Sequence, residues 1–363
     1  MTTNTRKLWL DVDPGHDDAT AILMAIHSPG IELLGLSTVH GNTNGQNTAI
    51  NAARCLVAFA AAPNVLVYPG APKPLIRETK HDPEIHGDDG LGGVEGLPSL
   101  EDPRVLARFA KDKKTGEIIS ADVGMATAIR REWKDGKGCK TTIVACGPET
   151  NLALFFAVHP ELIPAVEEIV FMGGGIGLGN RSAVAEFNIL CDPHSAQIVF
   201  DVPLPKFMVP LNVTHTAILT RPIHAQLLSG IPSPDISEKD PLPPAKTPLR
   251  HTLHTLVSFF AESYETIFNF TKGPPMHDPI TIAYLVKPEL FTSTRYRVDV
   301  ELEGRFTLGE TVADIWNYSA PDPESWGKGG KNVVLSEKLG VQGFFDMFLE
   351  CVDRCDAVSP LNQ

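Results

Sequence analysis

The sequence has no apolar run as long as the roughly 18 residues that a membrane-spanning helix needs, and no segment rich in Lys and Arg. Its 363 residues hold 44 Asp and Glu against 31 Lys and Arg, a formal net charge of −13. Such an acidic chain repels nucleic acids and anionic membrane surfaces, so we expect neither as a partner. The segment before the first apolar run is too short for a signal peptide, and we expect a cytoplasmic protein.

The sequence also lacks a Cys-x-x-Cys pair, an internal repeat and a clear interdomain linker. Its six cysteines are widely spaced, apart from Cys351 and Cys355, which is typical of reduced thiols rather than of a disulfide framework or a zinc site. Hydrophobic residues make up 43% of the chain, enough for a large core. We therefore predict one domain over residues 1–363, with long loops near 70–118 and 230–248.

Short apolar runs alternate with helical patterns along the first half of the chain. Strands are expected at 7–12, 32–39, 65–68, 141–146, 168–172 and 206–211, and helices at 17–27, 46–61 and 150–158. The later part predicts helices at 249–268 and 340–355 and strands at 294–303 and 331–336. This order predicts an α/β fold, an open, mostly parallel sheet with helices on both faces. Ligands bind beyond the carboxyl ends of the strands in such sheets, so the residues that follow each strand are candidates for the site.

Four carboxylates fall within eight residues after the first expected strand, in the segment Asp-Val-Asp-Pro-Gly-His-Asp-Asp over 11–18. Carboxylates packed together repel one another, and their pKa values rise. A hard cation with oxygen ligands removes that repulsion. An EF-hand does not fit, because Ile22 occupies the twelfth position, where a Glu is needed. The alternative is a helix N-cap followed by solvated acidic residues.

Two further segments follow later strands. Residues 171–192 contain five glycines, which let backbone approach a ligand closely but do not spell a dinucleotide fingerprint. Asn180, Glu186 and Asn188 in this segment suit sugar hydroxyls, and a plain polar loop is the alternative. In Cys-Gly-Pro-Glu-Thr-Asn over 146–151, a free backbone carbonyl could join the ligand shell of a metal. The alternative there is a strand-to-helix turn capped by Thr150 or Asn151.

Two histidine motifs complete the set of candidates. His277-Asp278-Pro279 precedes an apolar helix, and a His beside an Asp suits a general acid beside a metal ligand. The alternative is a turn in which Asp278 caps the helix. Ile85-His86-Gly87 lies in the first long loop, where a His is usually solvated, although on a lid it could reach a substrate.

Together these segments resemble the inosine-uridine nucleoside hydrolase family. Seven blocks match in order: 11–19, 40–44 (His-Gly-Asn-Thr-Asn), 85–87, 147–151, 171–174, 186–188 and 277–279. The matching blocks extend along nearly the whole chain, and the opening Asp-Val-Asp-Pro-Gly-His-Asp-Asp-Ala is the most specific of them. The sequence departs from the family pattern at Gly92-Gly93 and at Asn212, where relatives often carry Asp-Gly and Asp.

The resemblance implies a Ca²⁺-dependent enzyme that cuts the bond between ribose and base. It implies Ca²⁺ ligands in the carboxylates of Asp13, Asp18 and Asp278 and the backbone carbonyl of Cys146, with Asp13 also taking a proton from the attacking water and Asp11 supporting the site. It places Asp17, Asn42, Asn180, Glu186 and Asn188 on the ribose hydroxyls, Met172 beneath the sugar, His86 and Phe187 beside the base, and His277 as the acid that protonates the leaving base. Relatives are commonly homodimers or homotetramers, which we expect here too.

The expected substrate is a ribonucleoside, with uridine or inosine favoured. A purine-specific relative would stack Trp on the base, and none of the four Trp residues lies in a matching block, which favours uridine. Two alternatives remain at this point. Asp11-x-Asp13 after a first strand also resembles haloacid-dehalogenase-type phosphatases, and a nucleoside-binding protein without catalysis could share the fold.

Overall fold

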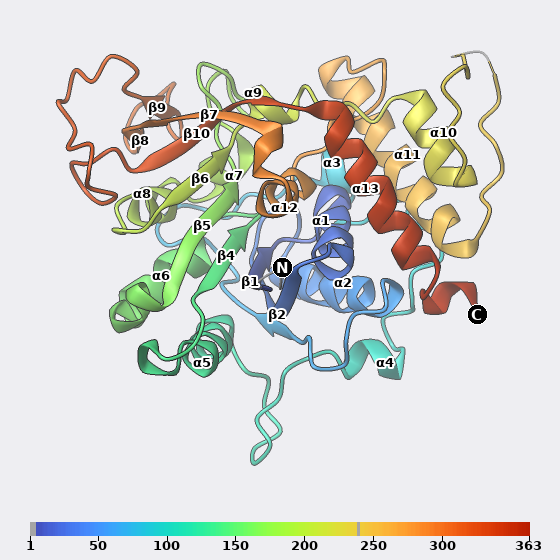
Figure 1. Cartoon of the computed structure of the whole chain (residues 1–363), viewed down its shortest axis with the longest axis horizontal. Coiled ribbons are helices and arrows are strands. Elements are labelled where there is room, and N and C mark those ends of the chain that lie inside the picture. Colours follow the sequence, from blue (N-terminus) through green and yellow to red (C-terminus); the bar gives the residue numbers. More distant parts are fainter. Residues whose placement is uncertain (1–4, 238–239) are drawn as a thin grey trace.

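A central sheet of eight strands organises the molecule, as Figure 1 shows. The computed structural model describes residues 5–237 and 240–363. The strand order is β3-β2-β1-β4-β5-β6-β10-β7, and every neighbouring pair is parallel except β10 and β7. The bounds are β1 Arg6–Val12, β2 Ile31–Thr38, β3 Val67–Pro69, β4 Thr141–Ala145, β5 Val166–Met172, β6 Lys206–Val209, β7 Phe291–Tyr296 and β10 Val333–Leu339. A separate antiparallel pair consists of β8 (Val298–Val300) and β9 (Thr311–Ala313).

Helices cover both faces of this sheet. One hydrophobic cluster joins the sheet to α1 (His16–His27), α2 (Gly45–Ala58), α10 (Arg221–Ser229), α11 (Pro248–Phe268), α12 (Pro279–Val286) and α13 (Val341–Asp356). A second cluster lies against α5 (Ala121–Trp133), α6 (Thr150–Val158) and α8 (Pro193–Phe200). Strand β1 shows why both layers form: Leu8 and Leu10 enter the first cluster, and Trp9 enters the second. Side chains alternate between the faces of a strand, so an uninterrupted apolar strand needs cover on both sides. The predicted fold class is confirmed.

The remaining helices are short. They are α3 Pro83–His86, α4 Pro103–Leu106, α7 Phe187–Cys191, α9 Leu211–Thr214, η1 Lys134–Gly136, η2 Pro160–Ala165, η3 Pro288–Leu290 and η4 Pro360–Asn362. Residues 70–118 contain only α3 and α4 and isolated bridges, as the loop prediction implies. In 230–248, the described residues are without helix or strand until α11 begins at Pro248. That the chain forms one domain stays a prediction.

The secondary structure differs from the prediction in several places. Helices α5, α8 and α10 were not predicted, although Ala121–Trp133 has the composition of an amphipathic helix. The strand predicted at 294–303 is two strands, β7 and β8, which belong to different sheets. The break falls at Arg297, between β7 and β8, and its guanidinium pairs with Asp201 and Asp299.

The carboxyl ends of four adjacent strands meet at one edge of the sheet. Asp13 directly follows β1, Asn42 lies four residues beyond β2, Cys146 follows β4 and Gly173 follows β5. The start of α12, which packs against α1, brings Asp278 to the same edge. This topology alone gathers the motifs of five separate segments, as the rule for open α/β sheets predicts.

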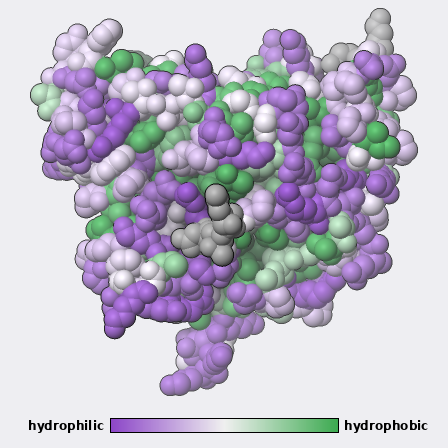
Figure 2. Space-filling view, viewed as in Figure 1, coloured by the Kyte–Doolittle hydropathy of each residue, from purple (hydrophilic) through white to green (hydrophobic). Residues whose placement is uncertain are grey.

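The face of the molecule seen in Figure 2 is mostly hydrophilic, with apolar residues in patches among the hydrophilic ones. Across residues 5–237 and 240–363, the helices are too short or too polar to cross a membrane.

Candidate active site

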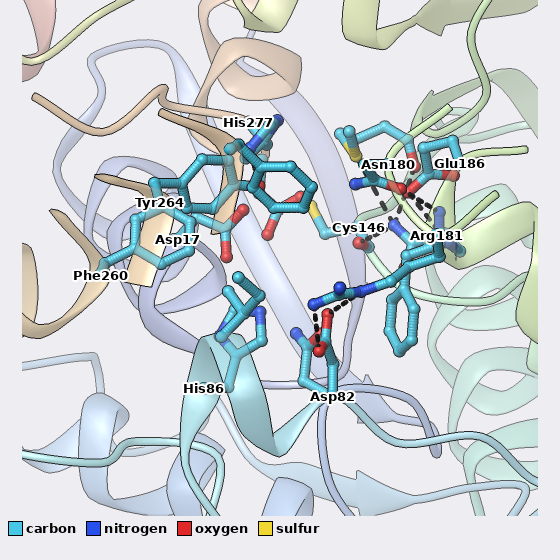
Figure 3. Close-up of a pocket in the computed structure, with 17 residues that line it drawn as sticks. Asp17, Asp82, His86, Cys146, Asn180, Arg181, Glu186, Phe260, Tyr264 and His277 are labelled. Carbon is cyan, nitrogen blue, oxygen red and sulfur yellow. Dashed lines mark hydrogen bonds and ion pairs between the residues drawn. The ribbon is translucent and has the colours of Figure 1, made fainter. Parts of the chain in front are cut away.

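A pocket opens at the carboxyl edge of the sheet, and Figure 3 shows the residues that line it. It holds about 410 Å³ of space free of atoms, part of it open to solvent. Eleven of the predicted site residues line it: Asp17, Asn42, His86, Cys146, Met172, Asn180, Glu186, Phe187, Asn188, His277 and Asp278. The three others, Asp11, Asp13 and Asp18, are wholly buried beneath these.

Four carboxylates, Asp13, Asp17, Asp18 and Asp278, form what we call the aspartate floor of the pocket. Asp17, Asp18 and Asp278 offer oxygen atoms that all lie within 4.8 Å of one another. The Asp18 carboxylate also accepts hydrogen bonds from the backbone N–H groups of Gly15 at 3.0 Å and Asp13 at 3.2 Å. Asp278 occupies the N-cap position of α12, but its side chain makes no capping bond there. The capping alternative for Asp278 is therefore wrong, whereas Asp18 does bond to the first turn of α1.

Because the aspartate floor is buried, its carboxyl groups ionise less readily when no positive charge lies nearby. Burial, with a smaller contribution from the neighbouring charge of Asp18, raises the pKa of Asp17 to about 8. Burial likewise raises the pKa of Asp18 to about 6 and, together with the other floor carboxylates, lifts those of Asp13 and Asp278 well above the ordinary value. At neutral pH and in the absence of a cation, the raised pKa values would keep Asp13, Asp17 and Asp278 protonated, whereas Asp18 would be largely ionised. A divalent cation with oxygen ligands would allow the protonated groups to ionise.

The Asp13 carboxylate is held between two backbone segments. The backbone N–H of Asn42 donates to Oδ2 at 2.8 Å, while Oδ1 is buried and without a hydrogen-bond partner in the described part of the chain. A Cβ at Gly147 would lie 2.5 Å from Oδ1, and one at Gly41 would also clash with this carboxylate. The two glycines therefore admit Asp13 to its position. A buried carboxylate oxygen without a partner is the kind of group that a cation or an ordered water satisfies, so the residues present fit a metal site.

Asp11 lies behind the floor in a hydrogen-bonded network. Its Oδ1 accepts from the Ser37 hydroxyl and from Asn151 Nδ2 at 2.7 Å, and Trp9 Nε1 donates to Ser37 at 2.8 Å. Asn151 thus holds Asp11 and does not cap α6, whose N-cap is Glu149 without a side-chain bond. The capping alternative for Thr150 and Asn151 is wrong.

The amide and carboxyl groups on one side of the pocket are oriented by backbone contacts. Glu186 accepts hydrogen bonds from the N–H groups of Gly174 at 2.9 Å, Asn188 at 2.8 Å and Ile189 at 3.1 Å. Asn180 Oδ1 accepts from Phe187 N at 2.9 Å. Asn188 Nδ2 donates to the Cys146 carbonyl at 2.8 Å, which leaves that oxygen a second lone pair for another partner. These bonds hold the side chains rigidly before any ligand arrives.

The opposite side consists of aromatic rings and histidines, and Figure 3 shows Phe260, Tyr264 and His277 there, across from Asn180 and Glu186. We call these three residues the aromatic wall. His277 Nε2 lies 2.7 Å from the Tyr264 hydroxyl, and its Nδ1 lies 2.8 Å from the Thr214 hydroxyl. Burial, with a smaller contribution from His215, lowers the pKa of His277 well below its ordinary value, so the ring is neutral at pH 7.

His86 reaches the pocket from α3 in the first long loop. Its Nδ1 lies 3.2 Å from His16 Nδ1, and its ring stacks on Phe260 with centroids 5.6 Å apart. Gly15 makes room for this ring, because a Cβ there would overlap it. His86 is therefore buried at the site and is not the solvated loop residue of the alternative interpretation.

Six lining residues were not identified as candidates: Asp82, Ile85, Arg181, Phe260, Tyr264 and Phe268. Phe260, Tyr264 and Phe268 belong to α11, where helical spacing indicates core packing and does not mark a site. Arg181 pairs with Asp82 through Nε at 2.8 Å and a second, Nη2 contact, and its guanidinium lies 5.6 Å from the centre of the Phe268 ring. No local pattern links two residues 99 positions apart.

Only about 40 Å³ of the pocket admits the centre of a water molecule, so the lining side chains must shift before a larger ligand enters.

Comparisons with known proteins identify the family of this chain. A sequence model described as inosine-uridine preferring nucleoside hydrolase matches residues 8–346. A probable ribonucleoside hydrolase of Dictyostelium discoideum is 34% identical over 349 residues, 96% of this chain and 94% of that protein. The pyrimidine-specific ribonucleoside hydrolase RihA of Salmonella paratyphi A is 36% identical over 341 residues, 94% of this chain and 96% of that protein. The solved purine-preferring ribonucleoside hydrolase from Gardnerella vaginalis aligns with a TM-score of 0.78 at 28% identity, covering 97% of this chain and 99% of that one. The chain belongs to the inosine-uridine preferring nucleoside hydrolase family.

Proposed function

We propose that this nucleoside hydrolase is a Ca²⁺-dependent N-ribohydrolase that releases free base and ribose from uridine or inosine. The observation that carries the proposal is the placement of the aspartate floor directly beneath a pocket with hydrogen-bonding groups on one side and the aromatic wall on the other. N-glycosidic cleavage passes through a ribosyl state with oxocarbenium character, which needs an activated water on one face and a stabilised leaving base.

Asp13, Asp18, Asp278 and the Cys146 carbonyl would hold Ca²⁺, which when bound supplies a positive charge that lowers the pKa of a nearby water. Asp13 is the proposed proton acceptor, because its Oδ1 is free of other hydrogen bonds among the described residues. Asp11 supports the floor through Ser37 and Asn151. Asp17 belongs to the group of three mutually close carboxylates, so it can contact the cation as well as a sugar hydroxyl.

Asp17, Asn42, Asn180, Glu186 and Asn188 are proposed to bind the ribose hydroxyls, with Met172 beneath the sugar. Glu186 retains lone-pair capacity after its three backbone bonds, since a carboxylate can accept about four. Because these groups are already held in place, contacts that tighten as the sugar flattens lower the barrier without a cost of reorganisation.

His277 is proposed to protonate the departing base, in concert with Tyr264. The buried ring is neutral before substrate binds, so it has to take up a second proton from solvent before it can give one to the base and return to the neutral form. The Tyr264 hydroxyl, 2.7 Å from Nε2, would orient the ring for that transfer. His86 and Phe187 line the pocket, where they would border the base.

The base preference rests on the composition of the pocket. No Trp belongs to its lining, so a purine would not find an indole to stack on, which favours uridine. The relatives include both a pyrimidine-specific and a purine-preferring enzyme, so inosine is the second candidate. Family membership argues against the phosphatase alternative, and catalysis distinguishes the enzyme from a protein that only binds nucleosides.

The test is ribose release from uridine, inosine, cytidine and adenosine, with Ca²⁺ and with EDTA, beside an Asp13→Ala variant. We expect release from uridine first, and its loss with EDTA and in the variant. Folded protein that releases no ribose from any nucleoside in the presence of Ca²⁺ would contradict the proposed activity. Light scattering of the purified protein tests the proposed homodimer or homotetramer, and fractionation of cells tests the proposed cytoplasmic location.

A further inference from the structure

The glycine-rich loop between β5 and α7, residues 173–185, carries Asn180 and leads into Glu186. It contains no helix or strand, only an isolated bridge at Ala185, and Gly174 and Gly177 adopt positive φ values of 74° and 65°. Backbone of this kind loses much conformational freedom when it is held in one place. The ligand-binding side chains on it therefore depend on external supports.

The β8–β9 pair supplies one such support, although it lies outside the main sheet. Thr311 of β9 is 2% exposed, while the next residue, Val312, is 50% exposed, so the strand turns Thr311 inward. Thr311 Oγ1 accepts a hydrogen bond from Gly175 N at 3.0 Å and donates one to the Gly175 carbonyl at 3.0 Å. One hydroxyl thus satisfies both polar groups of one loop residue. The adjacent Glu310 forms a bridge to Ala185, at the other end of the loop.

The same contact reaches Glu186 through Gly174. A Cβ on Gly174 would lie 2.8 Å from Thr311 Cγ2 and would overlap Met208, so the loop is closely packed between β9 and β6. The N–H of Gly174 donates to Glu186 Oε2 at 2.9 Å. The chain of contacts therefore runs from Thr311 to Gly175, to the adjacent Gly174, and then to the carboxylate of Glu186.

We propose that Thr311 is a positioning residue for nucleoside binding, and that the β8–β9 pair acts as the outer support of the ribose side of the pocket. This inference rests on the proposed function, in which Asn180 and Glu186 bind the sugar. Loss of the hydroxyl leaves the buried N–H and carbonyl of Gly175 without partners, which favours a displaced loop. The hydrogen bonds that the described residues make to the Thr311 side chain both go to Gly175 and none to the aspartate floor, so we expect the variant to keep the Ca²⁺ affinity of the wild-type protein.

The test compares Thr311→Val, which keeps the shape but removes the hydroxyl, with Thr311→Ser, which keeps the hydroxyl. Thr252→Val is the matched control, because Thr252 is equally buried and its hydroxyl bonds to a backbone carbonyl, that of Pro248, away from the pocket. We expect Thr311→Val to raise KM for the best nucleoside on the order of tenfold, with a smaller change in kcat. Thr311→Ser should restore KM to within about threefold, and Thr252→Val should leave it unchanged.

Hydrogen exchange of residues 173–186, measured by mass spectrometry on the same proteins with Ca²⁺ bound, gives a readout that does not require activity. Faster exchange in Thr311→Val alone supports the inference, even if the wild-type protein releases no ribose and the proposed function fails. Unchanged exchange and unchanged KM in Thr311→Val would overturn it. Equal effects of Thr311→Val and Thr252→Val would also overturn it, because they would indicate a general loss of stability.

Discussion

The aspartate floor and the aromatic wall face each other across one pocket but are constructed differently. Most of the floor comes from one segment, residues 13–18, which directly follows β1, and the backbone at the sheet edge binds its carboxylates. The wall comes from α11 and from His277, two residues before α12, and the Tyr264 hydroxyl bonds to His277. The floor is thus fixed by the sheet, whereas the wall is fixed by the packing of helices.

This difference suggests a division of labour. A metal site needs several ligands at nearly constant distances, which a sheet edge provides because strands cannot shift without breaking the ladder. A base-binding surface tolerates side-chain movement and can differ between relatives without loss of the reaction. We therefore expect changes in the floor to abolish catalysis for every nucleoside, and changes in the wall to alter the rate and the preference among bases.

The largest effect is expected from Asp18→Asn, which keeps the shape of the side chain and removes one charge. Ca²⁺ affinity should fall sharply, and kcat should fall by at least about 10³-fold for all nucleosides, because a catalytic cation contributes several kcal/mol to the barrier. Asp112→Asn is the matched control, since Asp112 also accepts two backbone N–H bonds but is exposed and distant from the pocket. Calorimetric titration of Ca²⁺ and ribose release measure the two effects. Tight Ca²⁺ binding by Asp18→Asn would remove Asp18 from the proposed ligand set.

The next effect concerns the wall. His277→Gln should lower kcat by about 10²-fold, the usual contribution of a general acid. Tyr264→Phe, which removes only the hydroxyl bonded to His277, should lower it by about tenfold. Both losses should shrink for a substrate such as p-nitrophenyl riboside, whose leaving group departs without protonation. Tyr284→Phe on the opposite end of α12, packed on Phe207, serves as control. An equal loss with both substrates would mean that the pair positions the sugar and does not donate a proton.

The pH dependence of Ca²⁺ binding should report on the aspartate floor and not on the aromatic wall. Burial raises the pKa of Asp17 to about 8 and that of Asp18 to about 6, so Ca²⁺ has to displace protons from these groups below those values. The apparent affinity should rise between pH 6 and 8, by up to about tenfold per pH unit for each proton displaced. Calorimetry in buffers of different ionisation enthalpy counts the protons released. A flat affinity over this range would show that the floor is already ionised.

The same carboxylates also determine how the stability of the Ca²⁺-free protein changes with pH. In EDTA the folded floor keeps protons that the unfolded chain, with Asp pKa values of about 4, releases as the pH rises. Stability without Ca²⁺ should therefore fall between pH 4 and 8, and Ca²⁺ should reverse that fall. Asp18→Asn should weaken the fall, because one of the repelling charges is gone.

The contrast also explains how far the sequence predicts the site. The alternation of strands and helices predicts the sheet, and the sheet predicts that motifs after β1, β4 and β5 meet, because side chains at strand ends share one edge. Tyr264 lies among the buried apolar residues of α11, and only its hydrogen bond to His277 indicates a role for its hydroxyl in the site. No sequence pattern marks Arg181 or Asp82 as a site residue, because each lies in an irregular loop and their contact depends on how the two loops fold over the sheet.

The smallest predicted effect concerns this Arg181–Asp82 pair, which joins the loop of His86 to the glycine-rich loop at the pocket. Arg181→Met keeps the aliphatic stem but leaves the Asp82 carboxylate buried without its partner, and burial already raises the pKa of Asp82. We expect Arg181→Met and Asp82→Asn each to raise KM about three- to tenfold with little change in kcat, because the closed arrangement of the loops would be less populated. The double variant should cost less than the sum of the single changes in free energy, since the two residues act on each other. A double variant whose effects simply add would show that the pair does not join the loops, and the wall side of the pocket would then close by the packing of α11 alone.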